Sequence, residues 1–181
     1  MEVKYVLKKK DFLTFQLFNA TQSEHLRKVR KRNLFILPTI FILLSLFFVS
    51  KGDLTIVGIY LSIAIAWFIF YPGYSRKRYK AYYEKYIVEN YHNRFDREVT
   101  LGLEDDYLYA KDHASESKTK ITEIAEAYET ADHLYIKFLT GHTHIVPKQR
   151  VDNFQSFRKT LKVLSQKLDI EYIDDPNWKW S

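Results

Sequence analysis

The sequence predicts an α+β membrane protein, in which a transmembrane hairpin of two helices is joined to a small antiparallel-sheet domain. Three observations support this fold class. Two long apolar runs without a charged residue lie within residues 33–73, separated by a short polar turn. Lysine and arginine are concentrated on both sides of these runs. After residue 95 the pattern changes to short alternating segments that end in an amphipathic helix, which is typical of an α+β domain.

The apolar runs are Leu34–Val49 and Leu54–Tyr71, and we place the two spans at residues 33–50 and 54–72. At about 1.5 Å per residue, each run would extend roughly 24–27 Å, close to a hydrocarbon thickness of about 30 Å. Since a helix satisfies its own backbone polar groups in lipid, we expect two helices. The connecting turn Ser50–Asp53 contains a glycine and is short enough to force an antiparallel hairpin.

The distribution of charge orients this hairpin. A net charge of +6 would suit a nucleic-acid-binding protein, but the charge is not spread along the chain. Residues 1–32 carry +6, residues 33–73 a net charge of zero, residues 74–97 +4 and residues 98–181 −4. Because the basic residues flank the apolar block, we expect no nucleic-acid partner, and the positive-inside rule places both termini in the cytoplasm. We expect the membrane to be a bacterial-type plasma (inner) membrane.

Two other interpretations of the apolar runs fit the sequence less well. A cleaved signal peptide would have a shorter apolar region and a small-residue cleavage site, whereas the first run begins after 32 residues and lacks such a site. The buried helices of a soluble bundle would need amphipathic helices to cover them on all sides, and the rest of the chain provides too few. We therefore expect both runs to lie in lipid.

The N-terminal segment, residues 1–32, combines a strand with a basic helix. Val3–Lys8 alternates apolar and basic residues, which predicts a short strand. Asp11 is placed to be the N-cap of a helix over Phe12–Arg32, whose far end is a cluster of lysine and arginine. This helix either lies in the membrane interface or packs on the protein's own domain, and the sequence does not separate these two arrangements.

The segment after the second span, residues 74–94, is rich in tyrosine, lysine and arginine and is expected to be helical. A similar composition occurs in RNA-binding segments, where aromatic rings stack on bases. Because this segment directly follows a transmembrane helix, contact with lipid headgroups is the better interpretation. Arg76, Lys77 and Arg78 are the candidate headgroup contacts.

Residues 95–170 are expected to form the cytoplasmic domain. Hairpins are predicted around Glu104–Asp106 and Thr140–Gly141, because short alternating segments flank turn residues at both places. Ser115–Thr119 fits either a loop or an edge strand. Ile121–Thr130 fits either a strand or a helix, since its apolar residues satisfy both periodicities.

The last part of the chain is predicted to be a helix followed by a tail. Asp152–Leu168 has the 3-4-3-4 spacing of apolar residues that indicates an amphipathic helix, with Asp152 or Asn153 as its cap. Residues 171–181 lack such a period and are expected to be a tail. Its two tryptophans, Trp178 and Trp180, could contact the bilayer or a groove on a partner.

Several short motifs occur in an order that resembles a known family. They are Tyr5 and Leu7 with Asp11 and Phe12, a basic stretch, two spans, and then Ile121-Thr122-Glu123, Tyr135-Ile136 and Ile145-Val146-Pro147-Lys148 before the last helix. The chain resembles the YcxB-like membrane proteins over nearly its whole length. The resemblance implies a pleckstrin-homology-like (PH-like) domain, a strongly bent antiparallel sheet closed by a C-terminal helix, to which Val3–Lys8 contributes a first strand. It favours a strand at Ile121–Thr130 and implies no catalytic residue.

No catalytic, cofactor-binding or metal-binding residue is expected. The sequence has no glycine-rich phosphate loop, nucleophile elbow or zinc-protease motif, and it has no cysteine for disulfides or thiolate metal sites. His142 and His144 would share a strand face, but no third ligand is near them, so exposed polar histidines are the better interpretation. Lys148 and Arg150 are candidate anion contacts, although their segment also fits a purely structural end of a strand. Three acidic residues are expected to form a solvated face: Glu123, Glu126 and Glu129.

We expect a membrane-anchored, non-enzymatic cytoplasmic binding or regulatory module, without a cofactor. Its expected partners are the lipid bilayer and a protein, either a different one or a second copy bound through the transmembrane hairpin. Gly58 and Ser62 form a small-xxx-small pair that suits such helix association. The alternatives are a module that senses anionic lipid and an enzyme whose site has no recognisable motif.

Overall fold

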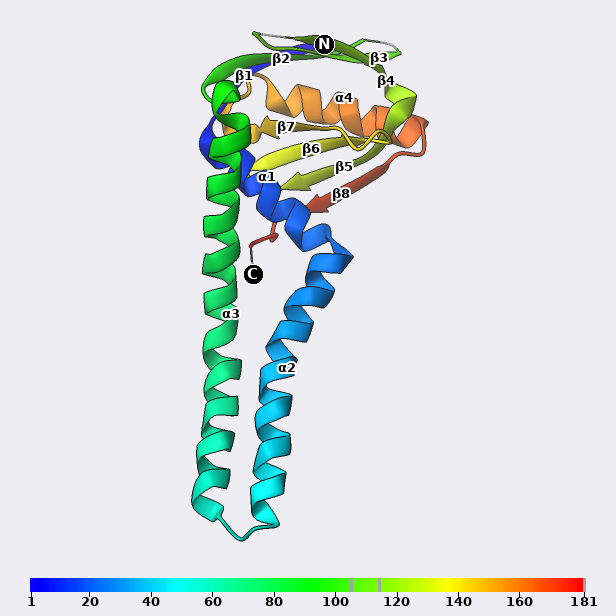
Figure 1. The fold of residues 1–181 in the computed structure, drawn as a ribbon. Coiled ribbons are helices and arrows are strands. Elements are labelled where there is room, and N and C mark those ends of the chain that lie inside the picture. The colour runs from blue at the N-terminus through cyan, green and yellow to red at the C-terminus, as the bar shows by residue number, and fades with distance from the viewer. Residues whose placement is uncertain (105, 114, 181) are drawn as a thin grey trace. The chain divides into compact units, whose positions relative to one another are not determined.

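The computed structural model describes residues 1–104, 106–113 and 115–180, and the fold is α+β (Figure 1). The chain divides into two compact units. The sheet unit consists of residues 1–15 and 87–179, and the helical unit consists of residues 16–86 with Trp180. Each unit is described by itself.

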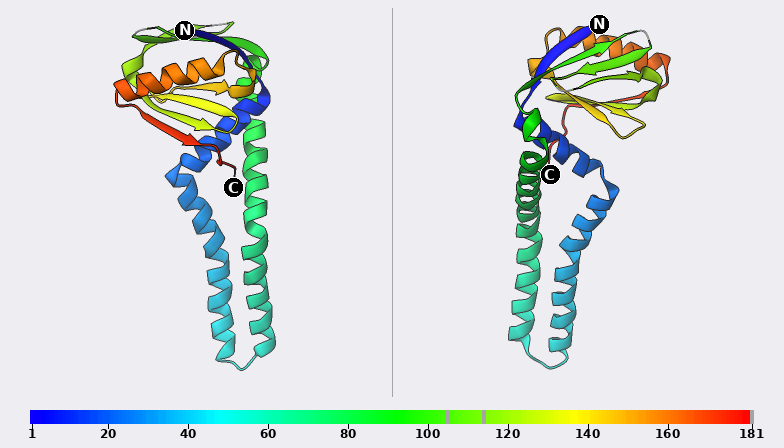
Figure 2. Two further views of the ribbon diagram at one scale, coloured as in Figure 1. Left: turned by 180° about the vertical axis from the view of Figure 1, so that it is seen from behind. Right: turned by 45° about the horizontal axis from the view of Figure 1, so that its top comes forward.

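The sheet unit contains two four-stranded sheets, and a C-terminal helix packs on both (Figure 2). The first sheet is antiparallel throughout, in the order β1-β2-β3-β4. Its strands are β1 (Glu2–Leu7), β2 (Arg97–Leu103), β3 (Tyr107–Lys111) and β4 (Glu116–Lys120). Val3 and Tyr5 alternate with exposed neighbours on β1 and are buried, as the predicted strand requires. The first strand of the chain therefore pairs with β2, which follows all three N-terminal helices.

The first sheet confirms one predicted hairpin and resolves one ambiguity. β2 and β3 are the two strands of this hairpin. The predicted turn between them is Glu104–Asp106, of which Asp105 lies outside the described residues. β4 shows that the segment after β3 is an edge strand rather than a loop.

The second sheet has the order β7-β6-β5-β8. Its strands are β5 (Ile124–Thr130), β6 (His133–Phe138), β7 (Thr143–Pro147) and β8 (Glu171–Asp175). β6 and β7 confirm the second predicted hairpin, whose Gly141 has a φ of +83°, a conformation that favours glycine. Ile121–Glu123 forms a 3-10 turn, η2, and the remainder of the ambiguous segment is β5. Strand partners on both sides of β5 outweigh the helix propensity of its alanine and glutamate residues.

The prediction of a tail from residue 171 onward is wrong for Glu171–Asp175. These residues form β8, which lies parallel to β5 in the register Tyr128↔Ile173. A strand of five residues offers too little alternation to be recognised in the sequence, and its formation depends on pairing with a distant segment.

The helix α4 (Phe154–Lys167) confirms the predicted amphipathic helix. Its buried Phe154, Phe157 and Leu161 join the core that both sheets share. Asn153 occupies the N-cap position but has a left-handed backbone with a φ of 60°, and its side chain makes no capping hydrogen bond. The apolar face of α4 therefore closes the core of the sheet unit.

The predicted helix Phe12–Arg32 is in fact two helices, α1 (Lys9–Gln22) and α2 (Glu24–Val49). Ser23 between them has an extended backbone, and its Oγ accepts a hydrogen bond from the Leu26 N–H at 3.3 Å. Serine favours this N-cap geometry, which begins a new helix. The apolar stripe of the segment is irregular, so it did not mark the break. α2 then continues through the basic cluster into the first apolar run.

Asp11 is not the N-cap of α1, as the sequence suggested, but its third helical residue. Its Oδ2 accepts a hydrogen bond from the backbone N–H of Lys8 at 2.7 Å, and Lys8 is the residue before the helix. In a capping box, the side chain of the third helical residue accepts a hydrogen bond from the backbone N–H of the N-cap residue, and Asp11 makes this one of the two bonds. The expected capping role is therefore shifted by three positions.

The helix α3 (Leu54–Tyr91) joins two segments that the sequence separated, the second span and most of residues 74–94. Pro72 lies inside it, followed by Gly73. The helix continues because residues 74–91 contain no further glycine or proline and include good helix formers such as arginine, lysine and glutamate. The α-helix ends at Tyr91, and a 3-10 turn, η1 (His92–Arg94), follows it.

In the helical unit, α2 and α3 form an antiparallel hairpin, and both are long and apolar enough to cross a membrane. The turn between them contains Gly52 with a φ of +77°. Phe35 lies against Phe68, with ring centroids 5.6 Å apart, and Phe41 against Tyr60 at 5.8 Å. Only 11% of the most apolar window of α2 and 6% of that of α3 is buried. Most residues of these apolar windows are thus at least partly exposed.

The small-xxx-small pair Gly58 and Ser62 is exposed. A Cβ placed on Gly58 would meet no atom within 4 Å. Ser45 and Ala64, which are each 3% exposed, are instead among the buried residues of the two helices. The role of Gly58 and Ser62 in association with a second chain stays a prediction.

Candidate functional site

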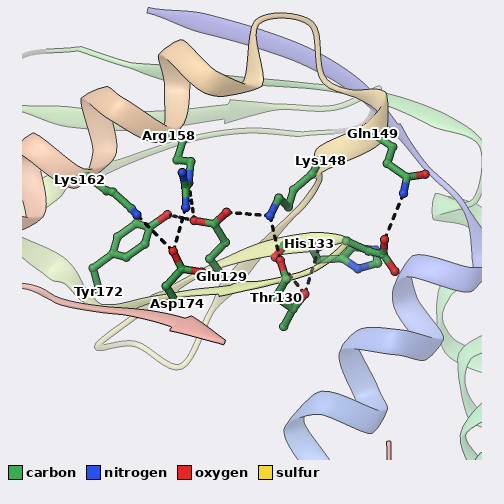
Figure 3. A network of polar contacts seen from close by, with 10 residues as sticks. Glu129, Thr130, His133, Lys148, Gln149, Arg158, Lys162, Tyr172 and Asp174 are labelled. Carbon is green, nitrogen blue, oxygen red and sulfur yellow. Dashed lines mark hydrogen bonds and ion pairs between the residues drawn. The ribbon is translucent and has the colours of Figure 1, made fainter. Parts of the chain in front are cut away.

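Glu129 on β5 is the centre of an ion-pair network in the sheet unit (Figure 3). Its side chain is 1% exposed and accepts hydrogen bonds from Lys148 Nζ at 2.7 Å, Arg158 Nε at 2.7 Å and the Tyr172 hydroxyl at 2.5 Å. Burial raises the pKa of this carboxyl, but the three donors outweigh burial and lower the pKa to about 2. The predicted solvated position is wrong for Glu129, because β5 is an interior strand covered on both faces.

The network extends from Glu129 to β8 through α4. Arg158 also donates a hydrogen bond to Asp174 Oδ2 at 2.8 Å, and Lys162 Nζ lies 3.3 Å from the same oxygen. Figure 3 shows Arg158 between the two carboxylates, with Tyr172 beside them. Hydrogen bonds donated to a buried carboxylate thus fasten α4 and β8 to β5, which helps to hold so short a strand.

A second buried carboxylate, Asp11, lies at the start of α1. Asp11 is 2% exposed and His133 is 4% exposed, and His133 Nε2 lies 2.9 Å from Asp11 Oδ1. Because a carboxylate only accepts, the Nε2–H is the donor. Arg150 donates to the same oxygen. Burial raises the pKa of Asp11, but the hydrogen bonds from His133, Lys8 and Arg150 outweigh burial and lower it.

An aspartate–histidine pair also occurs in catalytic triads, where the histidine's other nitrogen contacts a nucleophile. His133 Nδ1 has no hydrogen-bond partner among the described residues. The nearby Thr130 hydroxyl instead bonds the His133 backbone N–H and C=O, each at 3.1 Å. No nucleophile thus contacts His133 Nδ1 among the described residues, and the pair joins α1 to β6.

Lys148 and Arg150, which the sequence marks as candidate anion contacts, are each bound to a carboxylate of the sheet unit. Lys148 binds Glu129, and Arg150 binds Asp11. These pairs favour the structural interpretation of the segment between β7 and α4. Sequence reasoning missed both carboxylates because each lies far from its cation in the chain, and nothing local to Glu129 distinguishes it from Glu126.

His144 lies in β7 and His142 directly precedes this strand, and their ring centroids are 6.2 Å apart. Burial and, to a smaller extent, the charge of His142 together lower the pKa of His144 to about 4. No group of three or more potential metal ligands is found in the part of the chain that the structure describes.

A cleft of about 350 Å³ opens between η2 and the end of α4. Apolar side chains of Ile121, Leu164 and Leu168 line it. Its charged lining residues are Lys120, Lys167 and Asp106. Neither lysine forms an ion pair with another described residue. The two lysines outnumber Asp106, so the cleft offers an apolar surface with a net positive charge at its edge. No local sequence pattern marks this cleft.

The helical unit holds a basic cavity of about 270 Å³ between α2 and α3. Its cationic lining residues are Arg27, Arg30, Lys31 and Arg76. Of the three predicted headgroup contacts, only Arg76 lines this cavity; Lys77 and Arg78 are exposed on α3 elsewhere.

Trp180 belongs to the helical unit although it lies at the far end of the chain. Its ring is 4.9 Å from the Arg30 guanidinium, a cation–π distance. Its Nε1–H donates to the Arg76 carbonyl at 3.4 Å, and its ring packs on Tyr79 with centroids 6.3 Å apart. One of the two predicted tail tryptophans is thus held beside residues that line the basic cavity.

Comparisons of this chain with protein-family models, with curated proteins and with solved structures find no match.

Proposed function

We propose that this chain is an integral membrane protein whose helices α2 and α3 anchor a non-enzymatic binding module. The observation that carries this proposal is the exposed apolar surface of the two helices. Side chains such as Leu43, Leu46, Ile65 and Phe70 are at least 60% exposed. A water-soluble protein rarely leaves so large an apolar surface uncovered, whereas lipid tails would cover it without loss.

The charges at the ends of the helices support a cytoplasmic location of both flanks. Basic residues precede the first apolar run and follow the second, and the turn between the helices carries only Lys51. By the positive-inside rule, the turn then faces the opposite side. The location proposed is a bacterial-type plasma membrane.

The sheet unit supports the proposed relation to the YcxB-like proteins and their PH-like domain. It has two sheets of mainly antiparallel strands and a C-terminal helix packed on both, which is compatible with the bent sheet closed by a helix that the resemblance implies. The first strand comes from before the helices, as the resemblance implies. Fold analogy alone assigns no activity, so the function is argued from the surface of the unit.

The cleft between η2 and α4 is the proposed site for a protein partner. Lys120 and Lys167 outnumber Asp106 and leave the cleft with a net positive charge, while its leucines make it apolar. A protein segment that carries a carboxylate beside an apolar side chain complements both properties. The most strongly perturbed carboxylates, Glu129 and Asp11, are engaged in ion pairs instead, which favours binding over catalysis.

This function is tested with full-length protein purified from membranes in mild detergent. We expect a recurrent co-purifying protein, and Lys120→Glu with Lys167→Glu should reduce its recovery about tenfold or more, because each substitution places like charges together. Lys159→Glu on the exposed face of α4 is the matched control, since Lys159 does not line the cleft. Absence of any recurrent partner and of self-association would contradict the proposal.

A further inference from the structure

The basic cavity between α2 and α3 brings cations from both helices to one place. Arg27 and Lys31 are one turn apart on α2, and Arg76 is on α3. None of these three forms an ion pair with another described residue, and no aspartate or glutamate lines the cavity among the residues that the structure describes. Like charges spaced by one turn repel each other within a helix. An anion bound in the cavity would relieve this repulsion.

The cavity also contains a hydroxyl group without a partner. Ser75 lines it and is only 4% exposed, yet its Oγ has no hydrogen-bond partner among the described residues. A buried polar group without a hydrogen bond is unfavourable and uncommon in folded proteins. A ligand oxygen in the cavity would supply the missing acceptor.

Arginine indicates which anion fits. The planar guanidinium presents several N–H donors in a fixed fork that matches the oxygens of phosphate, while lysine adds a point charge. Two or more arginines, a lysine and a serine hydroxyl form a donor set suited to a phosphate group. Arg30 is oriented by Trp180, whose ring lies against its guanidinium.

The position of the cavity along the helices indicates where the phosphate comes from. Tyr71 and Pro72 line it at the end of the second apolar run. Tyr71 stacks on Trp67, one turn further into that run, with ring centroids 4.8 Å apart. Tryptophan and tyrosine mark the headgroup layer of membrane helices, and basic residues next to it attract anionic lipid.

We propose that this cavity binds the phosphate group of an anionic lipid headgroup, with Arg27, Lys31, Arg76 and the Ser75 hydroxyl as donors. This inference rests on the membrane anchoring proposed above. It concerns a different ligand and a different unit from the cleft for a protein partner.

The test uses full-length protein in mild detergent, titrated with dioctanoyl phosphatidic acid, dioctanoyl phosphatidylcholine and inorganic phosphate, with binding measured by native mass spectrometry. We expect saturable binding of phosphatidic acid and at least tenfold weaker binding of the other two. Arg76→Gln and Lys31→Gln should each weaken phosphatidic acid binding about tenfold, because each removes a hydrogen bond to a charged group. Ser75→Ala should weaken it a few-fold.

Neighbouring residues provide matched controls with the same change in charge. Lys77→Gln on α3 and Arg32→Gln on α2 do not alter the cavity lining and should leave the affinity unchanged. If the cavity variants and these controls lost the same amount of affinity for phosphatidic acid, the binding would depend only on general surface charge, and the proposal would be overturned. Inorganic phosphate binding as tightly as phosphatidic acid would overturn the lipid assignment.

Anchoring is checked separately by alkaline extraction of membranes that contain the wild-type protein. Release of the protein by alkali would refute membrane anchoring, whatever the titration gives. Retention in the membrane without a preference for phosphatidic acid would refute the cavity assignment alone.

Discussion

His133 on β6 donates a hydrogen bond of 2.9 Å to Asp11, although the helices α2 and α3 separate the two residues in the chain. Both side chains are almost fully buried, and Arg150 binds the same carboxylate. The contact fastens the first turn of α1 to the second sheet of the sheet unit. A single carboxylate thus holds together parts of the chain that precede and follow the helical hairpin.

Asp11→Asn should destabilise the protein by about 3 kcal/mol, because it leaves the Arg150 charge without its buried partner. Urea unfolding of the full-length protein in mild detergent, followed by circular dichroism, measures this change. Asp152→Asn serves as the control, since Asp152 is exposed just before α4. An effect of Asp11→Asn no larger than that of the control would contradict the structural role of the pair.

Glu129→Gln should also cost about 3 kcal/mol near neutral pH, because Lys148 and Arg158 then lose their common carboxylate. The pKa of Glu129 is lowered from 4.5 to about 2 in the folded protein. The ionised carboxylate therefore stabilises the fold above pH 4.5, and this stabilisation is lost as the pH falls towards 2. Unfolding measured at several pH values should show a smaller acid dependence in Glu129→Gln than in the wild type. Parallel curves would be inconsistent with the network.

His144 makes the fold sensitive to pH in a higher range. Its pKa is lowered from 6.5 to about 4, mainly by burial, so the folded state holds the ring neutral. The unfolded chain takes up a proton first as the pH falls, and stability should therefore decrease between pH 6.5 and 4. His144→Gln should reduce the difference in melting temperature between pH 7 and pH 4.5. His142→Gln should leave most of this difference, because the charge of His142 is the smaller cause.

Gly102→Ala should destabilise the first sheet by about 1–3 kcal/mol, because there is no space for a side chain. Gly102 on β2 lies opposite Tyr109 on β3, and a Cβ at Gly102 would lie 2.1 Å from the tyrosine ring. In a Tyr109→Ala background the same substitution should cost much less, which a double-mutant cycle measures. Equal costs in both backgrounds would show that the ring does not limit this position.

The elements that could be predicted from the sequence are those with a strong local period. The apolar runs, the hairpin at Gly141 and the amphipathic helix α4 all have one, and each is present in the structure. β5 was ambiguous because both periodicities fit its residues, and only pairing with β6 and β8 decides between them. The break at Ser23 depends on one serine side chain, which an apolar pattern does not register.

The candidate sites were less predictable, because they are assembled from distant segments. Arg76, Lys77 and Arg78 are equivalent in composition, yet only Arg76 lines the basic cavity, as the helix geometry of α3 determines. The burial of Glu129 follows from its position on an interior strand, which no local pattern reveals. The cleft beside η2 depends on the docking of α4 and had no signature in the sequence.

The antiparallel pairing of β1 with β2 restricts how many times the intervening chain can cross a bilayer. Two strands of one sheet must lie on the same side of a membrane, because their hydrogen bonds cannot form through it. The number of crossings between Leu7 and Arg97 must therefore be even, independently of any charge bias in the flanks. In the proposed membrane arrangement, α2 and α3 provide two crossings and satisfy this condition. Deletion of either helix would then place β1 and β2 on opposite sides of the membrane, and the first sheet would lose its edge strand.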